Sequence, residues 1–322
     1  MTEAMQGVSA GGGAGDGTTG AGDGAAGAGR PTAGAGGPHT PGAAEVTPRA
    51  RRRALNPSLV IGGTIVLAIV VLALVSYVWT PYVPMRVLPT EAYQTPNTEH
   101  WLGTDRLRRD VFTQILVGAR TTLYVGLVAV GVAALVGVPL GILAAMTPGW
   151  LGQLVMRGND VLLAFPALLL AIMFAALYGG STRVAMIAIG IATIPAFARI
   201  TRSGALGVMR SEYVLAARAA GRSPLAIAWR HVLPNVAGLV IVQASVSFAI
   251  AILAEAALAY LGLGTPTGQA SWGRMLYESQ STLRSAPHLA LIPGGAIALS
   301  VLGFNLFGDG LRDWLDPKLE HR

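Results

Sequence analysis

The residues that could carry chemistry in this 322-residue chain are few and lie far apart. Cysteine is absent, which excludes thiol nucleophiles, thiolate metal sites and disulfides. The five histidines are scattered, and neither an H-E-x-x-H nor a G-x-S-x-G motif occurs. The single lysine, Lys318, follows Pro317 rather than a glycine, so no P-loop can bind ATP here. We therefore expect no catalytic residue, no metal site and no cofactor in this chain.

Two polar side chains lie inside apolar runs, where ionisable and amide groups are costly. Glu255 either lines a translocation path, or hydrogen-bonds a neighbouring helix for packing, or lies near enough to the outer interface to stay hydrated, and these interpretations remain open. Gln243 is a second candidate for the path, although hydrogen bonding between helices is the commoner role for such a side chain.

A polar stretch from Ser211 to Asn235, SEYVLAARAAGRSPLAIAWRHVLPN, separates two long apolar runs. Its first part, Glu212 to Ala220, favours a helix, and Gly221 can adopt the left-handed conformation that ends one. Ser223 is a good N-cap residue with Pro224 at the first helical position. The pattern predicts two short capped helices, the second of which ends at Pro234.

The second predicted helix carries a small apolar group formed by Leu225, Ile227, Ala228 and Trp229. An ordinary basic loop is the alternative interpretation, but such a loop needs neither two capped helices nor an exposed tryptophan. The pattern therefore favours a surface that docks on a partner in the aqueous phase.

The composition explains which elements hold these residues. Hydrophobic residues make up 52% of the chain and charged residues only 12%, about half the share in soluble domains. Apolar runs long enough to cross a bilayer indicate an all-α polytopic membrane protein with six transmembrane helices. The expected spans are Leu59 to Trp79, Thr121 to Met146, Val161 to Tyr178, Val184 to Ala198, Val236 to Leu261 and Leu289 to Phe307.

Arginine placement predicts the orientation. Basic residues gather before the first span and in the stretch 199–235, and cytoplasmic loops carry such an excess, so both termini and this stretch are expected in the cytoplasm. Four arginines after the first span conflict with the rule: Arg106, Arg108, Arg109 and Arg120. In a membrane protein the net charge of +7 indicates topology and contact with anionic lipid rather than nucleic-acid binding.

The chain divides into four parts. Residues 1–48 form a Gly/Ala-rich tail that cannot bury enough apolar surface to order itself, so a disordered cytoplasmic tail is expected. Residues 49–120 hold the first span and an extracytoplasmic segment with a helix start at Asp105. A core of five spans follows at 121–310, including the loop 199–235, and 311–322 form a cytoplasmic tail.

Within the core, Gly137 and Gly141 have the GxxxG spacing of a close helix contact. Arg157 and Asp160 are expected to pair at the cytoplasmic rim. Trp272 to Leu283 is predicted as a short helix on the outer face.

The stretch resembles the EAA loop of the inner-membrane permeases of bacterial ABC importers. Its pattern is E-A-A, three residues, Gly, nine residues, I-x-L-P, and Ala216, Ala217, Gly221, Leu233 and Pro234 match it. Leu215 replaces the glutamate and His231 the isoleucine. LGTDRLRRDVF, DVLLAFPALLL, ILAEAALAYLGLG and FNLFGDGLRDWLDPK are similar to the dipeptide/oligopeptide/nickel branch, in matching order over residues 51–318. Arg108 stands where that branch usually has glycine.

The resemblance implies a C-type permease subunit of a type I peptide importer in the bacterial inner membrane. It implies a second permease, two ATP-binding subunits that hold ATP and Mg²⁺, and an extracytoplasmic solute-binding protein as partners. The second helix of the stretch would be the coupling helix seated on an ATPase. The residues that this role involves are Ala216, Ala217, Gly221, Ser223, Pro224, Leu225, Trp229, His231, Leu233 and Pro234.

Two alternatives remain. An importer of nickel or another small solute belongs to the same branch, although a metal path would favour histidines or acids that the spans lack. A non-ABC secondary transporter or membrane anchor would have no ATPase partner.

Overall fold

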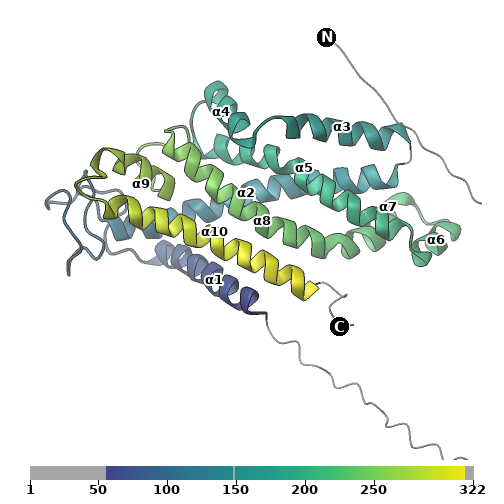
Figure 1. Cartoon of the computed structure of the whole chain (residues 1–322), viewed down its shortest axis with the longest axis horizontal. Coiled ribbons are helices and arrows are strands. Elements are labelled where there is room, and N and C mark those ends of the chain that lie inside the picture. The colour runs from purple at the N-terminus through teal and green to yellow at the C-terminus, as the bar shows by residue number, and fades with distance from the viewer. Residues whose placement is uncertain (1–55, 148, 316–322) are drawn as a thin grey trace, which may run out of the picture. The chain divides into compact units, whose positions relative to one another are not determined.

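The computed structural model describes residues 56–147 and 149–315, so the N-terminal tail predicted at 1–48 lies outside the described residues. Of the C-terminal tail predicted at 311–322, residues 311–315 belong to a helix instead, and the remainder lies outside the described residues. Within these ranges the regular structure is helical (Figure 1). The elements are α1 (Pro57–Val78), α2 (Val111–Met146), α3 (Trp150–Ala164), α4 (Ala167–Tyr178), α5 (Thr182–Met209), α6 (Glu212–Ala219), α7 (Pro224–Ile227), a π-helical turn (Ala228–Val232), α8 (Leu233–Tyr260), α9 (Trp272–Ser279), a 3₁₀ turn (Gln280–Thr282) and α10 (His288–Leu315).

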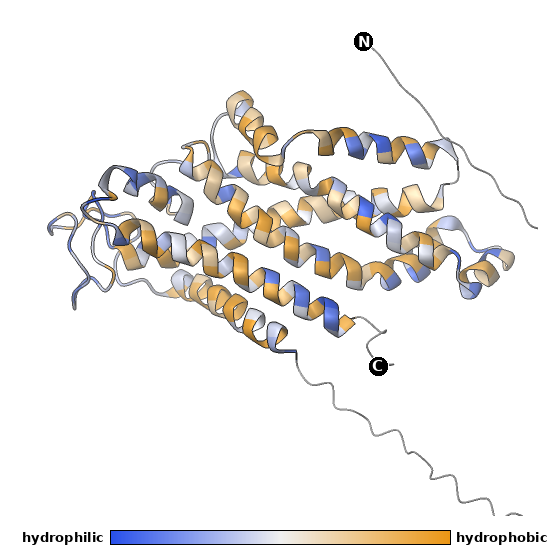
Figure 2. Cartoon of the chain, viewed as in Figure 1, coloured by the Kyte–Doolittle hydropathy of each residue, from blue (hydrophilic) through white to orange (hydrophobic). Residues whose placement is uncertain are grey.

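Six apolar segments could cross a membrane. Helices α1, α2, α5 and α10 are each long and apolar enough, and so is the continuous helix Pro224–Tyr260 that joins α7 to α8. Helices α3 and α4 together make the sixth segment, bent by 80° at their junction. Figure 2 shows apolar residues along these helices and hydrophilic ones toward the connections at their ends. The prediction of an all-α fold with six spans is confirmed.

The core is built from α2, α5, α8 and α10. Helix α2 packs along α5, and α8 lies against α5, α2 and α10, while α1 lies along α10 (Figure 1). The predicted close contact at Gly137 and Gly141 is confirmed. A Cβ atom at either position would lie less than 3 Å from the backbone of α5, so only glycine permits this approach.

Several spans extend beyond their predicted ends, among them α10, which runs to Leu315 instead of Phe307. Helix α2 begins at Val111 instead of Thr121 because the Asp110 carboxylate caps it, accepting from the Thr113 N–H at 2.7 Å. Helix α5 continues through Pro195 to Met209, so Arg199 and Arg202 belong to the helix and not to a loop. An interior proline removes one backbone hydrogen bond and bends a helix without necessarily ending it.

The third span is broken where one helix was expected. Helix α3 ends at Ala164, and Phe165 is extended, with φ −87° and ψ 126°. Proline disfavours the helical conformation in the residue before it, and Pro166 follows directly. The span therefore changes direction at this dipeptide.

The helix start predicted at Asp105 is wrong. Residues 104–110 form a turn closed by a bridge between Thr104 and Asp110. The Asp105 carboxylate accepts from the N–H groups of Leu107 and Arg109 at 2.8 Å each, which favours a turn over a helix.

Arg108 occupies a left-handed backbone conformation within this turn, with φ +58°. Glycine adopts this region freely, which is a physical reason for the glycine that the resembling branch has here.

Arg108→Gly should raise the thermal unfolding midpoint. Glycine relieves about 1–2 kcal/mol of left-handed strain in the folded state. It also raises the entropy of the unfolded chain, which lowers stability by about 0.4–1 kcal/mol, so a net gain in stability remains. The midpoint is measured by tryptophan fluorescence of the purified protein in detergent. Arg106→Gly is the control, because Arg106 is not among the residues with positive φ and should lose stability. Equal destabilisation by both substitutions would contradict the strain argument.

Candidate functional sites

The predicted end of the first short helix at Gly221 is confirmed. Gly221 has φ +75°, and its N–H donates to the Arg218 carbonyl at 2.9 Å. The Arg222 N–H reaches back to the Ala217 carbonyl at 3.1 Å, completing a Schellman motif at the end of α6. Nothing lies within 4 Å of a Cβ built at Gly221, so its conformation and not its surroundings requires glycine.

The second short helix begins as expected. The Ser223 hydroxyl accepts from the Ala226 N–H at 3.3 Å, and Pro224 occupies the first helical turn. Its predicted end at Pro234 is wrong, because α7 continues through the π-helical turn into α8. The Leu233 N–H donates to the Ala228 carbonyl five residues earlier. Pro234 then lies within the first turn of α8, where its missing N–H costs least.

A small apolar cluster holds this loop against the ends of the long helices. Val214 of α6, Ile227 of α7 and Val232 of the π-helical turn are each 2% exposed or less. They pack with Met209 of α5 and Val236 of α8. Ile227, predicted to belong to the exposed apolar group, is therefore an internal anchor.

The opposite face of the loop presents large apolar side chains to the surroundings. Leu225 is 70% exposed and Trp229 67% exposed, four residues apart on one helix face. Tyr213 and Leu215 of α6 are also about half exposed. The His231 ring lies 5.9 Å from the Tyr213 ring and so joins the π-helical turn to α6. Exposed apolar side chains gathered in this way mark interaction surfaces.

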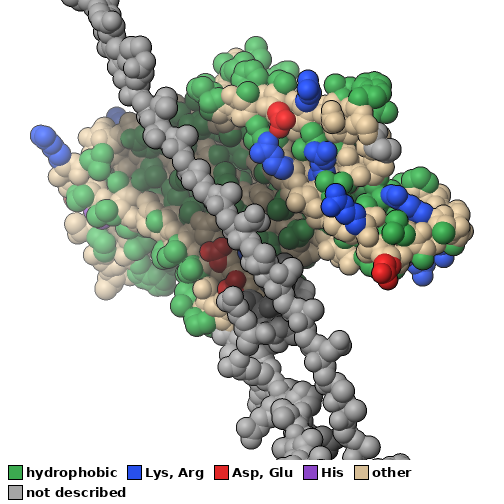
Figure 3. Space-filling view, turned by 45° about the vertical axis from the view of Figure 1, so that its right-hand side comes forward, with side chains coloured by type: hydrophobic (Ala, Val, Ile, Leu, Met, Phe, Trp, Pro, Cys, Tyr) green, Lys and Arg blue, Asp and Glu red, His purple; other side chains and the backbone are tan. Residues whose placement is uncertain are grey.

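Arginines surround this apolar surface. Arg210, Arg218, Arg222 and Arg230 are exposed, against the single acid Glu212. Figure 3 shows arginine side chains gathered on the side of the molecule that carries α6 and α7. The remaining predicted residues, Ala216, Ala217, Leu233 and Pro234, lie in α6 or at the start of α8, so the structure brings the whole predicted set together.

Glu255 lies near the C-terminal end of α8 and is 1% exposed. Its Oε1 accepts a hydrogen bond from the Thr265 hydroxyl at 3.1 Å, in the connection between α8 and α9. The geometry corresponds to the packing alternative. Gln243 lies one turn from Ser247, to whose hydroxyl its Nε2 donates at 3.0 Å, so this amide is bonded within its own helix.

Asp160 pairs with Arg199 of α5 at 2.9 Å rather than with Arg157 as predicted. The continuation of α5 beyond Pro195 brings Arg199 into reach of α3. Both partners are more than half exposed, so the pair contributes little stability.

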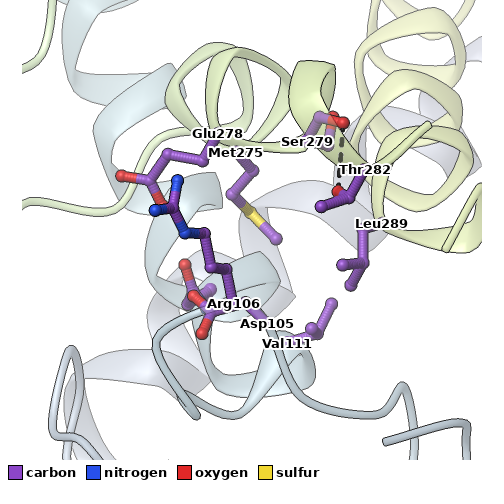
Figure 4. Close-up of a pocket in the computed structure, with 9 residues that line it drawn as sticks. Asp105, Arg106, Val111, Met275, Glu278, Ser279, Thr282 and Leu289 are labelled. Atoms are coloured by element: carbon purple, nitrogen blue, oxygen red, sulfur yellow. Dashed lines mark hydrogen bonds between the residues drawn. The ribbon is translucent and has the colours of Figure 1, made fainter. Parts of the chain in front are cut away.

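The sequence did not predict an ionic cluster at the other end of the molecule. Figure 4 shows two of its carboxylates, those of Asp105 and Glu278. The Arg109 guanidinium is 4% exposed and contacts the carboxylates of Asp105, at 2.6 Å, and Glu278 of α9. Glu278 also accepts from Arg274 at 3.0 Å, and Gln114 donates to Asp105 at 2.9 Å. Arg109 and Glu278 are 169 positions apart in sequence, so no local pattern reveals the contact.

Among the described residues, no three His, Cys, Asp or Glu side chains come together as a metal site.

Comparison with known proteins identifies the family. Residues 137–321 match the model of the binding-protein-dependent transport system inner membrane component. The chain is 42% identical over 265 residues to a dipeptide transport system permease protein of Alkalihalophilus pseudofirmus, covering 82% of this chain and 87% of that one. It is 43% identical over 280 residues to a putative peptide transport system permease protein of Brucella abortus, covering 87% and 94%.

A glutathione transport system permease protein of Pectobacterium atrosepticum is 43% identical over 225 residues, covering 70% of this chain and 75% of that one. Among solved structures, the MetNI methionine ABC transporter in an inward-facing conformation has a similar fold. The TM-score is 0.52 at 18% identity, covering 62% of this chain and 94% of that chain. The chain belongs to the family of inner-membrane components of binding-protein-dependent transport systems.

Proposed function

We propose that this chain forms, with a second permease subunit, the path by which an ATP-driven importer moves peptides across the bacterial inner membrane. The proposal extends to this chain the substrates named for its relatives, which are dipeptides, peptides and glutathione. Two ATPase subunits bind ATP and Mg²⁺ and supply the energy. A solute-binding protein outside the membrane delivers the peptide. This chain contributes no catalytic residue and no cofactor site.

The observation that carries the proposal is the exposure of Leu225 and Trp229 on a helix continuous with a membrane-spanning segment. The coupling surface, comprising Tyr213, Leu215, Leu225 and Trp229, offers an apolar knob at the arginine-rich end of the molecule. An apolar groove with an acidic rim on each ATPase is complementary to it. The excess of arginine at this end supports a cytoplasmic location for the surface and for both termini.

The continuous backbone makes this contact mechanically useful. A rigid ATPase movement applied at Trp229 acts on α8 without an intervening flexible loop. The anchors Val214, Ile227 and Val232 carry the same movement into the ends of α5 and α8. Docked elements transmit rigid-body motions in this manner.

Trp229→Asp should abolish ATPase assembly or uncouple ATP hydrolysis from uptake, while membrane insertion remains normal. Loss of a central tryptophan contact weakens binding by about 2 kcal/mol or more, roughly thirtyfold in affinity. Co-purification of the ATPase subunits and the ATP hydrolysed per solute imported are measured together.

Trp229→Phe is the matched control, because it keeps an aromatic ring at the same place and should retain most coupling. Gly221→Val tests the orientation of the same surface, because valine is strained at φ +75° and should change the direction in which α7 leaves α6. Normal uptake in both Trp229→Asp and Gly221→Val would exclude the coupling role.

The substrate class has its own test in proteoliposomes that contain the complete importer. ATP-dependent accumulation of labelled dialanine is expected, with inhibition by excess unlabelled dipeptide and none by Ni²⁺. Accumulation of Ni²⁺ in place of the dipeptide would contradict the peptide assignment and support the metal alternative of the same branch.

A further inference from the structure

Glu255 is the only acidic residue in the continuous helix Pro224–Tyr260. Its side chain is 1% exposed. The Thr265 hydroxyl donates to the carboxyl oxygen Oε1 at 3.1 Å. A buried carboxylate is costly, so its retention here requires the partners that the fold supplies.

Thr265 belongs to the outer connection, residues 261–271, and is 2% exposed. The connection ends at Ser271, which is fully buried and is the N-cap residue of α9, since its hydroxyl accepts from the Arg274 N–H at 3.1 Å. Glu255 therefore bonds the outer end of α8 to the connection that leads into α9.

Further contacts join the outer connection and α9 to α2. The Trp272 indole donates to the Ile115 carbonyl at 3.0 Å, and the Thr121 hydroxyl donates to the Ala270 carbonyl at 2.8 Å. Glu278 of α9 also contacts Arg109 in the ionic cluster. Movement at the start of α9 consequently reaches the outer segment around Asp105 and Arg109.

The other end of the same helix carries Leu225 and Trp229 of the coupling surface. The continuous helix spans 37 residues, which at 1.5 Å per residue is about 55 Å. A hydrogen-bonded helix of this length transmits displacement along its axis better than a jointed pair of helices. Glu255 is thus the junction between the helix and the body that it would move.

We propose that Glu255 is a positioning residue for transport, which fastens the outer connection and α9 to α8 so that the coupling surface controls the outer face. The proposal rests on the proposed function, because it requires an ATPase that moves the coupling surface. Glu255 need not touch the solute in this role.

The absence of cysteine permits a direct test on the complete importer in lipid nanodiscs. Thr267→Cys introduces a single thiol in this chain on the exposed part of the outer connection. Its maleimide labelling rate is compared between the nucleotide-free and the ATP-vanadate-trapped importer, with the partner subunits made cysteine-free. We expect the rate to depend on nucleotide in the parent.

In Thr265→Val, the ratio between the labelling rates of the two nucleotide states should fall by roughly tenfold, while basal ATPase activity persists. Tenfold is the factor that corresponds to the loss of one hydrogen bond to a charged group. Thr265→Ser should restore the ratio. Thr122→Val is the matched control, since the Thr122 hydroxyl is buried without a hydrogen-bond partner in the described chain. This control should respond like the parent.

If Thr265→Val fails to assemble, the labelling rates are measured instead in the double variant Glu255→Leu with Thr265→Val. Replacing both polar partners by apolar groups is nearly neutral for folding, so this variant should assemble. A parental response in either Thr265→Val or the double variant would overturn the proposal, as would a parent that shows no response. Failure of the proposed function is distinguishable, because Trp229→Asp would then leave ATPase assembly and the labelling response unchanged.

Discussion

The helical continuity from Pro224 to Tyr260 is the constraint on which the other features of the molecule depend. In a bilayer every backbone N–H and C=O must be satisfied within the protein, which makes a long helix the natural mechanical element. Here the helix extends past the membrane span and ends in the exposed Leu225 and Trp229. The Schellman motif at Gly221 and the cap at Ser223 then set the angle at which this end leaves α6.

Pro234 explains why the sequence did not predict that α7 continues into α8. A proline in a helix interior lacks an N–H and its ring clashes with a preceding carbonyl, so a helix end was the reasonable expectation. The π-helical turn Ala228–Val232 shifts the bonding register just before the proline and removes the conflict. Such turns depend on tertiary packing, here of Val232 in the loop cluster, and leave no periodic signal in the sequence. Pro195 likewise led to a predicted helix end, at Ala198, that the structure does not have.

Local features were predictable because their causes are local. Apolar run length gave the six segments, Gly137 and Gly141 gave the contact with α5, and Gly221 and Ser223 gave the helix caps. Features that join distant positions were not predictable. Glu255 could be recognised as a buried acid, but Thr265 became its partner only when the chain folded back over α8. The two helices of the third span required the geometry of Phe165 and Pro166.

The same limit explains the arginines that conflict with the expected orientation. Arg109 is neutralised by Asp105 and Glu278, and Arg120 donates to Ser76 at 2.6 Å with its guanidinium 4.0 Å from the Tyr77 ring centroid. Two of the four charges are thereby paired or stacked within the fold. The ionic cluster also ties the outer segment to α9, so both ends of the molecule are connected to α8.

The most direct test of this account is the distance between spin labels at Leu225→Cys and Tyr260→Cys in the complete importer. The two positions mark the ends of the continuous helix and are both exposed. The account predicts one unchanged distance with and without ATP, while the distance from Leu225→Cys to a label at Leu177→Cys on α4 changes. A change of about 5 Å, one helical turn, between the first pair would show that the helix bends or breaks and would contradict the central claim.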